Sequence, residues 1–361
     1  AIAFLAAKRG CASAAITASH NPYLDNGVKL FANGGVKLSD AQQDAIESHM
    51  TGSATVPAAS ALQVDLLGEY ASHIVGLFPV LAFANIRVVL DCANGAMSDV
   101  APEVFARLGA TVIVLNDRPN GKNINEVCGA THPEVVSEAV RLHKADLGLA
   151  FDGDGDRVIA VDHIGDVVDG DHLIALAAID LHKRGKLKSN SVAVTVMTNA
   201  GFHQAMTKAG INVITTPVGD RNILVAFDEH GVVLGGEQSG HIIYRDYATT
   251  GDGLLAGAML VDLVRREAKP LATLARNAMT SLPQTLINIR VAQVVNSPAE
   301  DLAAEITDAT KRLDGIGRVL LRASGTEPVV RVMVEAASQE TADAVAQGLA
   351  EVVSQRFGGV R

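Results

Sequence analysis

Short apolar runs alternate with segments of helical spacing along much of the chain. Apolar runs at 87–91 and 111–115 flank a helical pattern at 101–108. This order of strand, helix and strand predicts a β-α-β unit. A similar order returns between 192 and 215, which indicates an internal repeat of α/β domains, although the segment lengths differ.

The C-terminal part of the chain has a different order of elements. Strand patterns at 286–291, 318–321 and 329–334 are interleaved with helical patterns at 298–313 and 339–353. The order β-α-β-β-α predicts a small α+β domain with an antiparallel sheet.

The start of the chain predicts two short strands and a helix. The strands are expected at 14–17 and 28–31, and the helix at 40–50, where Ser39 or Asp40 can cap its first turn. Residues 51–61 are rich in Ser, Thr, Ala and Pro, so they predict a loose connection.

Composition narrows the class of protein. The chain has 361 residues, 48% of them hydrophobic, and a net charge of -10, which favours small-molecule partners over nucleic acid. Three cysteines without CxxC spacing predict reduced thiols in a cytoplasmic protein. No apolar run approaches the ~18 residues of a membrane-spanning helix. The chain does not begin with Met, so we expect it to start partway into a domain.

An acidic run provides the first candidate for chemistry. Three aspartates alternate with two glycines over residues 152–156, between two apolar runs, and Arg157 follows. Carboxylates this close would repel one another unless a hard cation such as Mg²⁺ or Ca²⁺ held them. A solvated acidic turn is the alternative. An EF-hand is excluded, because Arg157 and His163 occupy its glycine and glutamate positions.

Ser19 lies in a constrained turn, Thr17-Ala-Ser-His-Asn-Pro22. Adjacent side chains of an extended segment point in opposite directions, so Ser19 and His20 alone do not predict a nucleophile and its base. An ordinary turn serine is the simpler interpretation.

Three further loops carry polar groups suited to a ligand. Residues 216–221 offer backbone donors and an arginine after a strand. The loop 235–241 combines a carboxylate, a hydroxyl and an imidazole, which suits sugar hydroxyls, with a plain polar hairpin as the alternative. Residues 322–328, with Arg331, gather arginines, hydroxyls and glycine-exposed amides that suit a phosphate. Neither a Walker A sequence nor GxGxxG is present.

Five segments in order carry a family resemblance. From Ile16 to its end, the chain resembles the α-D-phosphohexomutase superfamily. Gln238 stands where phosphomannomutase and phosphoglucomutase relatives usually carry Met, so this loop is similar to the branch that acts on glucosamine phosphates. The five segments are Thr17-Ala-Ser-His-Asn-Pro22, Asp91-Cys-Ala-Asn-Gly95, Phe151-Asp-Gly-Asp-Gly-Asp-Arg157, Gly236-Glu-Gln-Ser-Gly-His241 and Arg322-Ala-Ser-Gly-Thr-Glu-Pro328.

The resemblance implies three similar mixed-sheet α/β domains, the first incomplete, and a C-terminal α+β domain with an antiparallel sheet. We expect the domains at 1–72, 73–176, 177–284 and 285–361, carrying in turn the phosphoserine, metal, sugar and phosphate loops. The family's opening strand and Gly-Thr-Asp-Gly-like segment do not precede Ala1. We therefore expect an N-terminally truncated chain with exposed strand edges in its first sheet.

The resemblance also implies a reaction. Glucosamine 6-phosphate and glucosamine 1-phosphate would interconvert through a phosphoserine at Ser19 and a 1,6-bisphosphate intermediate, feeding UDP-N-acetylglucosamine and cell-wall synthesis. Glucosamine or glucose 1,6-bisphosphate would be the activating phosphoryl donor. A phosphoglucomutase or phosphomannomutase, or a non-catalytic phosphosugar-binding remnant, is the alternative. The partners would be a small phosphosugar and a second copy of the chain, with no nucleic acid or membrane.

Site residues follow by the same resemblance. Lys29 would transfer a proton or stabilise charge, and His20 and Arg157 would position the transferring phosphoryl group. Mg²⁺ would be held by Asp152, Asp154, Asp156 and a phosphate oxygen on Ser19. The substrate-binding residues would be Gly219, Asp220, Arg221, Glu237, Ser239, His241, Arg322, Ser324, Gly325, Thr326 and Arg331.

Overall fold

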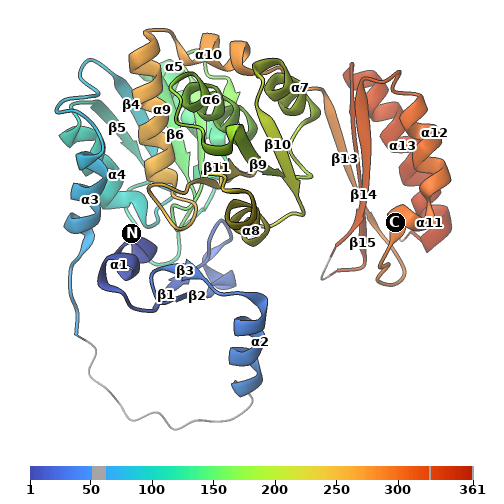
Figure 1. The fold of residues 1–361 in the computed structure, drawn as a ribbon, viewed down its shortest axis with the longest axis horizontal. Coiled ribbons are helices and arrows are strands. Elements are labelled where there is room, and N and C mark those ends of the chain that lie inside the picture. Colours follow the sequence, from blue (N-terminus) through green and yellow to red (C-terminus); the bar gives the residue numbers. More distant parts are fainter. Residues whose placement is uncertain (51–61, 325–326, 360–361) are drawn as a thin grey trace. The chain divides into compact units, whose positions relative to one another are not determined.

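The computed structural model describes residues 1–50, 62–324 and 327–359. It forms two compact units, one made of residues 1–198 and 206–279, the other of residues 199–205 and 280–361 (Figure 1). The connection predicted at 51–61 lies outside the described residues, as do Gly325 and Thr326 of the predicted phosphate loop.

The first unit begins with a small antiparallel sheet, which we call the serine sheet because Ser19 follows its first strand (Figure 1). Its order is β1-β2-β3, and the strands predicted at 14–17 and 28–31 are confirmed. Ser39 and Gln42 form a capping box at the helix predicted at 40–50. The elements are α1 (Ile2–Arg9), β1 (Ser13–Thr17), η1 (Tyr23–Asp25), β2 (Gly27–Ala32), β3 (Val36–Lys37) and α2 (Asp40–His49).

One face of the serine sheet is apolar and exposed. Ile16 is 83% exposed and Val28, its cross-strand partner, is 63% exposed. The alternate side chains Ala15 and Phe31 are buried on the opposite face. The sheet therefore contacts the rest of the unit through that inner face.

A five-stranded sheet follows, in the order β5-β4-β6-β7-β8. Strands β5, β4 and β6 are parallel, and β6, β7 and β8 are antiparallel. The acidic run 152–156 forms the turn between β6 and β7. The elements are α3 (Leu67–Gly76), β4 (Arg87–Asp91), α4 (Met97–Arg107), β5 (Thr111–Leu115), η2 (Gly129–Thr131), α5 (Pro133–His143), β6 (Leu147–Phe151), β7 (Val158–Asp162), β8 (Val167–Val168) and α6 (Gly170–Lys183).

The next sheet repeats this arrangement. Strands β10, β9 and β11 are parallel, and β12 returns antiparallel to β11. Since β5-β4-β6-β7 has the same pattern, the internal repeat predicted from the sequence is confirmed. The elements are η3 (Lys188–Asn190), β9 (Ser191–Thr195), α7 (Ala200–Ala209), β10 (Asn212–Thr216), α8 (Asp220–His230), β11 (Leu234–Gly236), β12 (Ile242–Tyr244), α9 (Gly253–Glu267) and α10 (Leu271–Ala278).

The second unit contains an antiparallel sheet in the order β13-β15-β14, as predicted for an α+β domain. The helix predicted at 298–313 is two helices, because the buried Leu302 leaves the helical backbone at φ -121° and ψ 27°. None of the described helices is long and apolar enough to cross a bilayer. The elements are β13 (Gln284–Arg290), α11 (Pro298–Asp301), α12 (Ala303–Lys311), β14 (Gly317–Ala323), β15 (Val329–Ala336) and α13 (Gln339–Phe357).

Candidate active site

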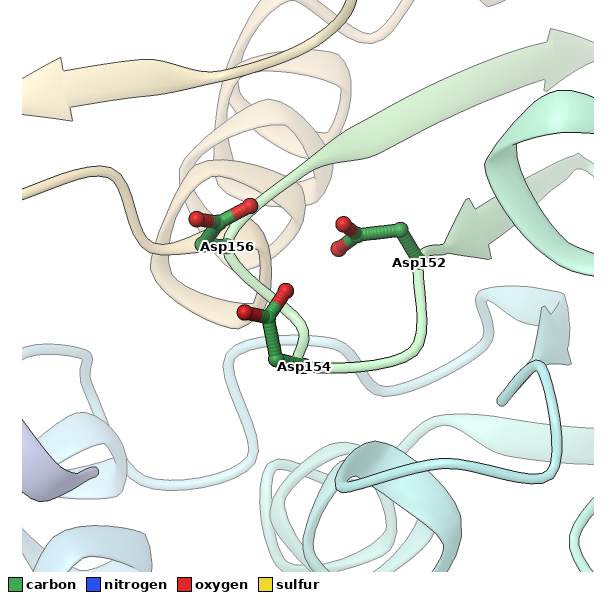
Figure 2. Close-up of side chains that lie close together, drawn as sticks. All are labelled: Asp152, Asp154 and Asp156. Atoms are coloured by element: carbon green, nitrogen blue, oxygen red, sulfur yellow. The ribbon is translucent and has the colours of Figure 1, made fainter. Parts of the chain in front are cut away.

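The turn between β6 and β7 gathers three carboxylates, and we call residues 152–156 the metal loop. Figure 2 shows the side chains of Asp152, Asp154 and Asp156 converging on one point. One oxygen from each lies within 4.8 Å of the others. Gly155 has φ 71°, a backbone conformation that favours glycine and lets the chain turn this sharply.

Each of these aspartates accepts a hydrogen bond on one carboxylate oxygen, and among the described residues the other oxygen accepts none. Asp152 Oδ1 accepts a backbone N–H at 3.1 Å. Asp154 Oδ2 accepts from Lys29 at 2.5 Å and from Thr17 at 3.0 Å, and Asp156 Oδ2 accepts from Lys29 at 3.1 Å. Asp152 Oδ2, Asp154 Oδ1 and Asp156 Oδ1 are buried without a hydrogen-bond partner among the described residues. Three unpartnered carboxylate oxygens fit a hard divalent cation.

The pKa values of Asp152 and Asp156 are shifted in opposite directions. Burial and the neighbouring carboxylates of Asp156 and Asp154 raise the pKa of Asp152 well above its ordinary value. Burial acts on Asp156 in the same direction, but His241, Lys29 and Arg157 lower its pKa below the ordinary range. The loop thus holds one carboxylate that ionises with difficulty beside one that is fully ionised, and a bound cation would favour the charged form of both.

The Ser19 loop lies directly against the metal loop. A Cβ atom on Gly153 would come within 2.5 Å of the Ser19 carbonyl oxygen, so only glycine allows this approach. Ser19 has φ 51°, and its N–H donates to Thr17 Oγ1 at 2.7 Å. Asn125 Nδ2 donates to the carbonyl oxygens of Ser19 and Asn21, each at 2.8 Å. These hydrogen bonds stabilise a backbone conformation that is unfavourable for serine.

Ser19 and His20 are closer than their adjacency in sequence suggested. Ser19 Oγ lies 3.4 Å from His20 Nδ1. The expectation that the two side chains point apart is wrong here, because the left-handed φ of Ser19 breaks the extended conformation on which it depends. Burial, followed by the charge of Arg157, lowers the pKa of His20.

Lys29 connects the serine sheet with the metal loop through its ion pairs to Asp154 and Asp156. Burial alone would lower the pKa of Lys29, but the carboxylates of Asp156 and Asp154 raise it above its ordinary value. Lys29 therefore carries a positive charge at neutral pH.

The motif at 91–95 packs against the metal loop. Asp91 is buried and accepts from the backbone N–H groups of Ala93 and Gly129, each at 2.9 Å. A Cβ atom on Gly95 would come within 2.2 Å of the Gly153 carbonyl oxygen, and Ala96 N–H, directly after the motif, donates to that oxygen at 2.8 Å. The motif thus shapes the loop that presents the aspartates.

The predicted sugar loop and the loop before α8 contact each other. Gly219 has φ 116°, and its N–H donates to Glu237 Oε1 at 3.1 Å. Asp220 forms an ion pair with Lys37 of β3, and its Oδ2 lies 3.3 Å from Nε2 of the buried His241. The structure therefore brings Gly219, Asp220, Glu237 and His241 together.

Two other predicted substrate-binding residues of the first unit, Arg221 and Ser239, are not part of this group of contacts. Arg221 donates to Asp40 and Gln43 of α2, so its guanidinium is engaged within the protein. Ser239 is exposed at its loop.

A cavity of about 690 Å³ borders the serine sheet and the metal loop. Thr17, Lys29 and Asp154 line it on one side. In its wall Tyr70 Oη donates to both oxygens of Asp252, at 2.7 and 2.8 Å. Its lining includes Asp154 and Asp156 but not Ser19 or Glu237, so the cavity lies beside the candidate site.

The predicted phosphate loop of the second unit brings two arginines together. Arg322 on β14 and Arg331 on β15 are directly opposite each other in the antiparallel pair. Burial and the charge of Arg331 lower the pKa of Arg322. No carboxylate of the described residues forms an ion pair with either arginine, and Ser324 beside them is buried. Facing like charges of this kind suit a bound anion.

Comparison with known proteins identifies the family to which the chain belongs. Models of the phosphoglucomutase/phosphomannomutase family match its alpha/beta/alpha domain I at residues 1–56, domain II at 68–165, domain III at 169–282 and the C-terminal domain at 286–352. The phosphoglucosamine mutase of Frankia casuarinae is 49% identical over 348 residues, which cover 94% of this chain and 75% of the relative. That of Brevibacillus brevis is 43% identical and covers 99% of this chain and 81% of the relative.

The chain belongs to the phosphoglucosamine mutase family. It is therefore an isomerase of the phosphohexomutase superfamily. The four matched domains, the mixed sheets and the antiparallel C-terminal sheet confirm the fold class that the sequence predicted.

Solved structures share the phosphohexomutase fold at low sequence identity. A phosphoglucomutase/phosphomannomutase family protein from Burkholderia thailandensis has a TM-score of 0.76 at 24% identity, covering 95% of this chain and 76% of that one. The Aspergillus fumigatus N-acetylphosphoglucosamine mutase in complex with GlcNAc-6P and magnesium has a TM-score of 0.72 at 19% identity, covering 99% and 91%.

Three contacts of this phosphoglucosamine mutase family member were not predicted from its sequence. Thr17 lies in one of the five segments that carry the family resemblance, but neither Thr17 nor Asn125 had a predicted role. Lys37 lies in a two-residue strand with no local signal. All three hold the serine sheet or its loop in place.

Proposed function

We propose that this chain interconverts glucosamine 6-phosphate and glucosamine 1-phosphate through a phosphorylated Ser19. The observation that carries the proposal is the contact between the Ser19 carbonyl oxygen and Gly153. Through it, a serine in a strained turn and three carboxylates with unpartnered oxygens share one site. A phosphoserine there would lie beside the cation that offsets its charge.

We assign the cation as Mg²⁺, held by Asp152, Asp154, Asp156 and a phosphate oxygen on Ser19. The three unpartnered oxygens support this assignment, since oxygen ligands suit Mg²⁺. When bound, Mg²⁺ would neutralise charge on the transferring phosphoryl group. Glucosamine or glucose 1,6-bisphosphate would phosphorylate Ser19 before the first turnover.

The chain's own residues would supply positioning and charge. The Oγ–P bond of phosphorylated Ser19 breaks as a sugar hydroxyl oxygen forms the new O–P bond, and the hydroxyl proton ends on Ser19 Oγ. Lys29 brings a fixed positive charge close to the serine loop. Arg157 Nε is buried without a hydrogen-bond partner among the described residues and lies 3.9 Å from Asp156 Oδ1, so Arg157 would bind the phosphoryl group beside the metal loop. His20, 3.4 Å from Ser19 Oγ, would orient that group.

The bisphosphate intermediate must then reorient, so that Ser19 recovers the other phosphoryl group. Glu237 and Ser239 would read the sugar hydroxyls in both orientations. The non-reacting phosphate would bind Arg322, Ser324 and Arg331, with Gly325 and Thr326, which lie outside the described residues. Substrate contacts of Gly219, Asp220, Arg221 and His241 stay predictions, because their described contacts are within the protein.

The proposed location is the cytoplasm. Cys11, Cys92 and Cys128 are free. Burial, with the charge of Asp91, raises the pKa of Cys128 to about 12, so this thiol is unreactive. The proposed partner is a small phosphosugar, and a homodimer stays a prediction.

Intact-mass measurement and turnover test the function together. The chain incubated with glucose 1,6-bisphosphate and Mg²⁺ should gain one phosphate, which Ser19→Ala should lose and the exposed control Ser48→Ala should keep. Turnover should have a higher kcat/KM for glucosamine 6-phosphate than for glucose or mannose 6-phosphate. Faster turnover of mannose 6-phosphate would favour a phosphomannomutase. Sugar-phosphate binding without phosphorylation or turnover would favour a non-catalytic remnant.

A further inference from the structure

The inner face of the serine sheet contacts the rest of the unit through polar side chains. The strand register places Thr17, Lys29 and Lys37 on this face. Thr17 and Lys29 donate to Asp154 of the metal loop, at 3.0 and 2.5 Å. Lys37 instead forms an ion pair with Asp220, at the start of α8. A second attachment of the sheet therefore lies outside the metal loop.

Asp220 continues this attachment back to the metal loop. The same oxygen, Asp220 Oδ2, accepts from Lys37 and lies 3.3 Å from His241 Nε2. On the other side of the ring, His241 Nδ1 lies 3.6 Å from Asp156 Oδ2. Lys37, Asp220, His241 and Asp156 thus follow one another at ion-pair distances, and His241 Nε2 makes no hydrogen bond with a described residue.

The imidazole in this path has little freedom to move. The His241 side chain is 4% exposed, and Gly251 packs flat against its ring. A Cβ atom on Gly251 would come within 2.3 Å of His241 Cε1. Because the ring is held in place, it keeps the Asp220 carboxylate and the Asp156 carboxylate at a constant separation.

We propose that Asp220 is a positioning residue for phosphoryl transfer: its carboxylate joins Lys37 of the serine sheet to His241 beside Asp156, and so fixes the Ser19 loop against the metal loop. This inference rests on the proposed function, since it concerns the same site. Mutation of a group that hydrogen-bonds to a metal ligand and so orients it typically lowers metal affinity or activity by about 10- to 100-fold. Asp220 acts through His241, so we expect an effect at the lower end.

Asp220→Asn, with Asp228→Asn as its control, tests the proposal. Asp228 lies on the same helix, is exposed and pairs with Arg245. Asp220→Asn should lower kcat about tenfold with KM for glucosamine 6-phosphate unchanged, and should weaken Mg²⁺ binding in calorimetric titration about tenfold. Asp228→Asn should change neither. Equal Mg²⁺ affinity and equal kcat in all three proteins would overturn the proposal.

Lys37→Met separates positioning from simple charge, and it also serves if Asp220→Asn does not fold. Removing a cation near the carboxylates would tighten Mg²⁺ binding if only charge mattered. Positioning predicts instead a kcat about tenfold lower, no tighter Mg²⁺ binding, and a double variant no worse than Asp220→Asn. Lys37→Arg should keep most of the activity. Tighter Mg²⁺ binding with wild-type kcat in Lys37→Met would overturn the proposal.

The Mg²⁺ titration needs no turnover, which keeps the two proposals distinguishable. A wild-type chain that neither accepts phosphate nor turns over would refute the mutase activity. Weaker Mg²⁺ binding in Asp220→Asn, but not in Asp228→Asn, would still support the positioning role.

Discussion

Lys29 Nζ lies 2.5 Å from Asp154 Oδ2, so a strand of the serine sheet and the metal loop, 125 residues apart in sequence, share one ion pair. Lys29→Met should lower kcat about 100-fold, because a fixed charge beside the transferring group is lost. KM for glucosamine 6-phosphate should change little. Steady-state kinetics measure both constants. Lys188→Met removes an exposed lysine paired with Asp246 and should keep wild-type kcat. Equal kcat in both variants would contradict a role for the Lys29 charge.

The Asp152 carboxylate should favour Mg²⁺ binding but destabilise the metal-free fold. Asp152→Asn should weaken Mg²⁺ binding and lower kcat strongly. The same change should raise the Tm of the metal-free protein, because burial and the neighbouring carboxylates oppose the charge of Asp152. Mg²⁺ at a hundred times its dissociation constant should stabilise the wild-type chain by about 2.7 kcal/mol and the variant by much less. Thermal unfolding with Mg²⁺ and with a chelator measures this difference, and full activity of the variant in chelator would exclude the metal role.

Asn125 stabilises the strained serine turn through its two hydrogen bonds to the carbonyl oxygens of Ser19 and Asn21. Asn125→Ala should lower kcat about tenfold and stability by about 1–2 kcal/mol. Chemical denaturation and kinetics give both values. Asn26→Ala removes one exposed hydrogen bond to the Tyr23 carbonyl oxygen, and should leave kcat unchanged. A tenfold loss in that control would mean that the whole loop, and not Asn125, sets the rate.

Local patterns in the sequence predicted most of the fold and the metal loop. The apolar runs on either side of 152–156 predicted the strands β6 and β7. The alternating aspartates and glycines between them indicated a metal-binding turn without any knowledge of tertiary contacts. The predicted strand at 28–31 and the helix at 40–50 lie within one or two residues of β2 and α2. Such features depend on neighbours in sequence, which the sequence displays directly.

Long-range contacts account for what the sequence did not predict. The left-handed φ of Ser19 depends on Asn125, about a hundred residues away, so an extended turn was expected and the approach to His20 was missed. The role of Lys37 could not be predicted, because its partner Asp220 is far away in sequence and is brought close only by the fold. The separation of α11 and α12 likewise depends on the burial of Leu302 in the core of its domain.

Replacing Gly251 and Gly348 by alanine should change the unfolding free energy in opposite directions. Gly251→Ala should displace the His241 ring, since the new Cβ would lie 2.3 Å from Cε1. We expect it to lower the unfolding free energy by about 1–3 kcal/mol, as overpacking does. Gly348 lies within α13 with no atom near its Cβ position, so Gly348→Ala should raise the unfolding free energy by about 0.5–1 kcal/mol. Denaturant unfolding compares them, and a neutral Gly251→Ala would show that His241 is free to move.

Asp180 on α6 gives a prediction for pH. Arg266 on α9 donates to both oxygens of Asp180 at 2.8 Å, and Arg184 donates to one of them at 3.0 Å. Burial alone would raise the pKa of Asp180, but the two arginines lower it below its ordinary value. The folded protein therefore holds the Asp180 proton less tightly than the unfolded chain does. This contribution to stability is present above the ordinary aspartate pKa of about 3.9 and is lost as the pH falls through the folded-state value.

Asp180→Asn should accordingly lower the unfolding free energy by about 2 kcal/mol at pH 7, because the three hydrogen bonds from Arg266 and Arg184 lose the charge of their carboxylate acceptor. The difference from wild type should shrink as the pH falls below 4, where the wild-type carboxylate itself takes up a proton. Urea unfolding at several pH values measures this. Asp308→Asn, which removes an exposed ion pair with Lys311, should leave stability unchanged across the same range. A gap between Asp180→Asn and wild type that stays constant down to the lowest pH would show that packing, and not the ionised pair with Arg266, accounts for the loss.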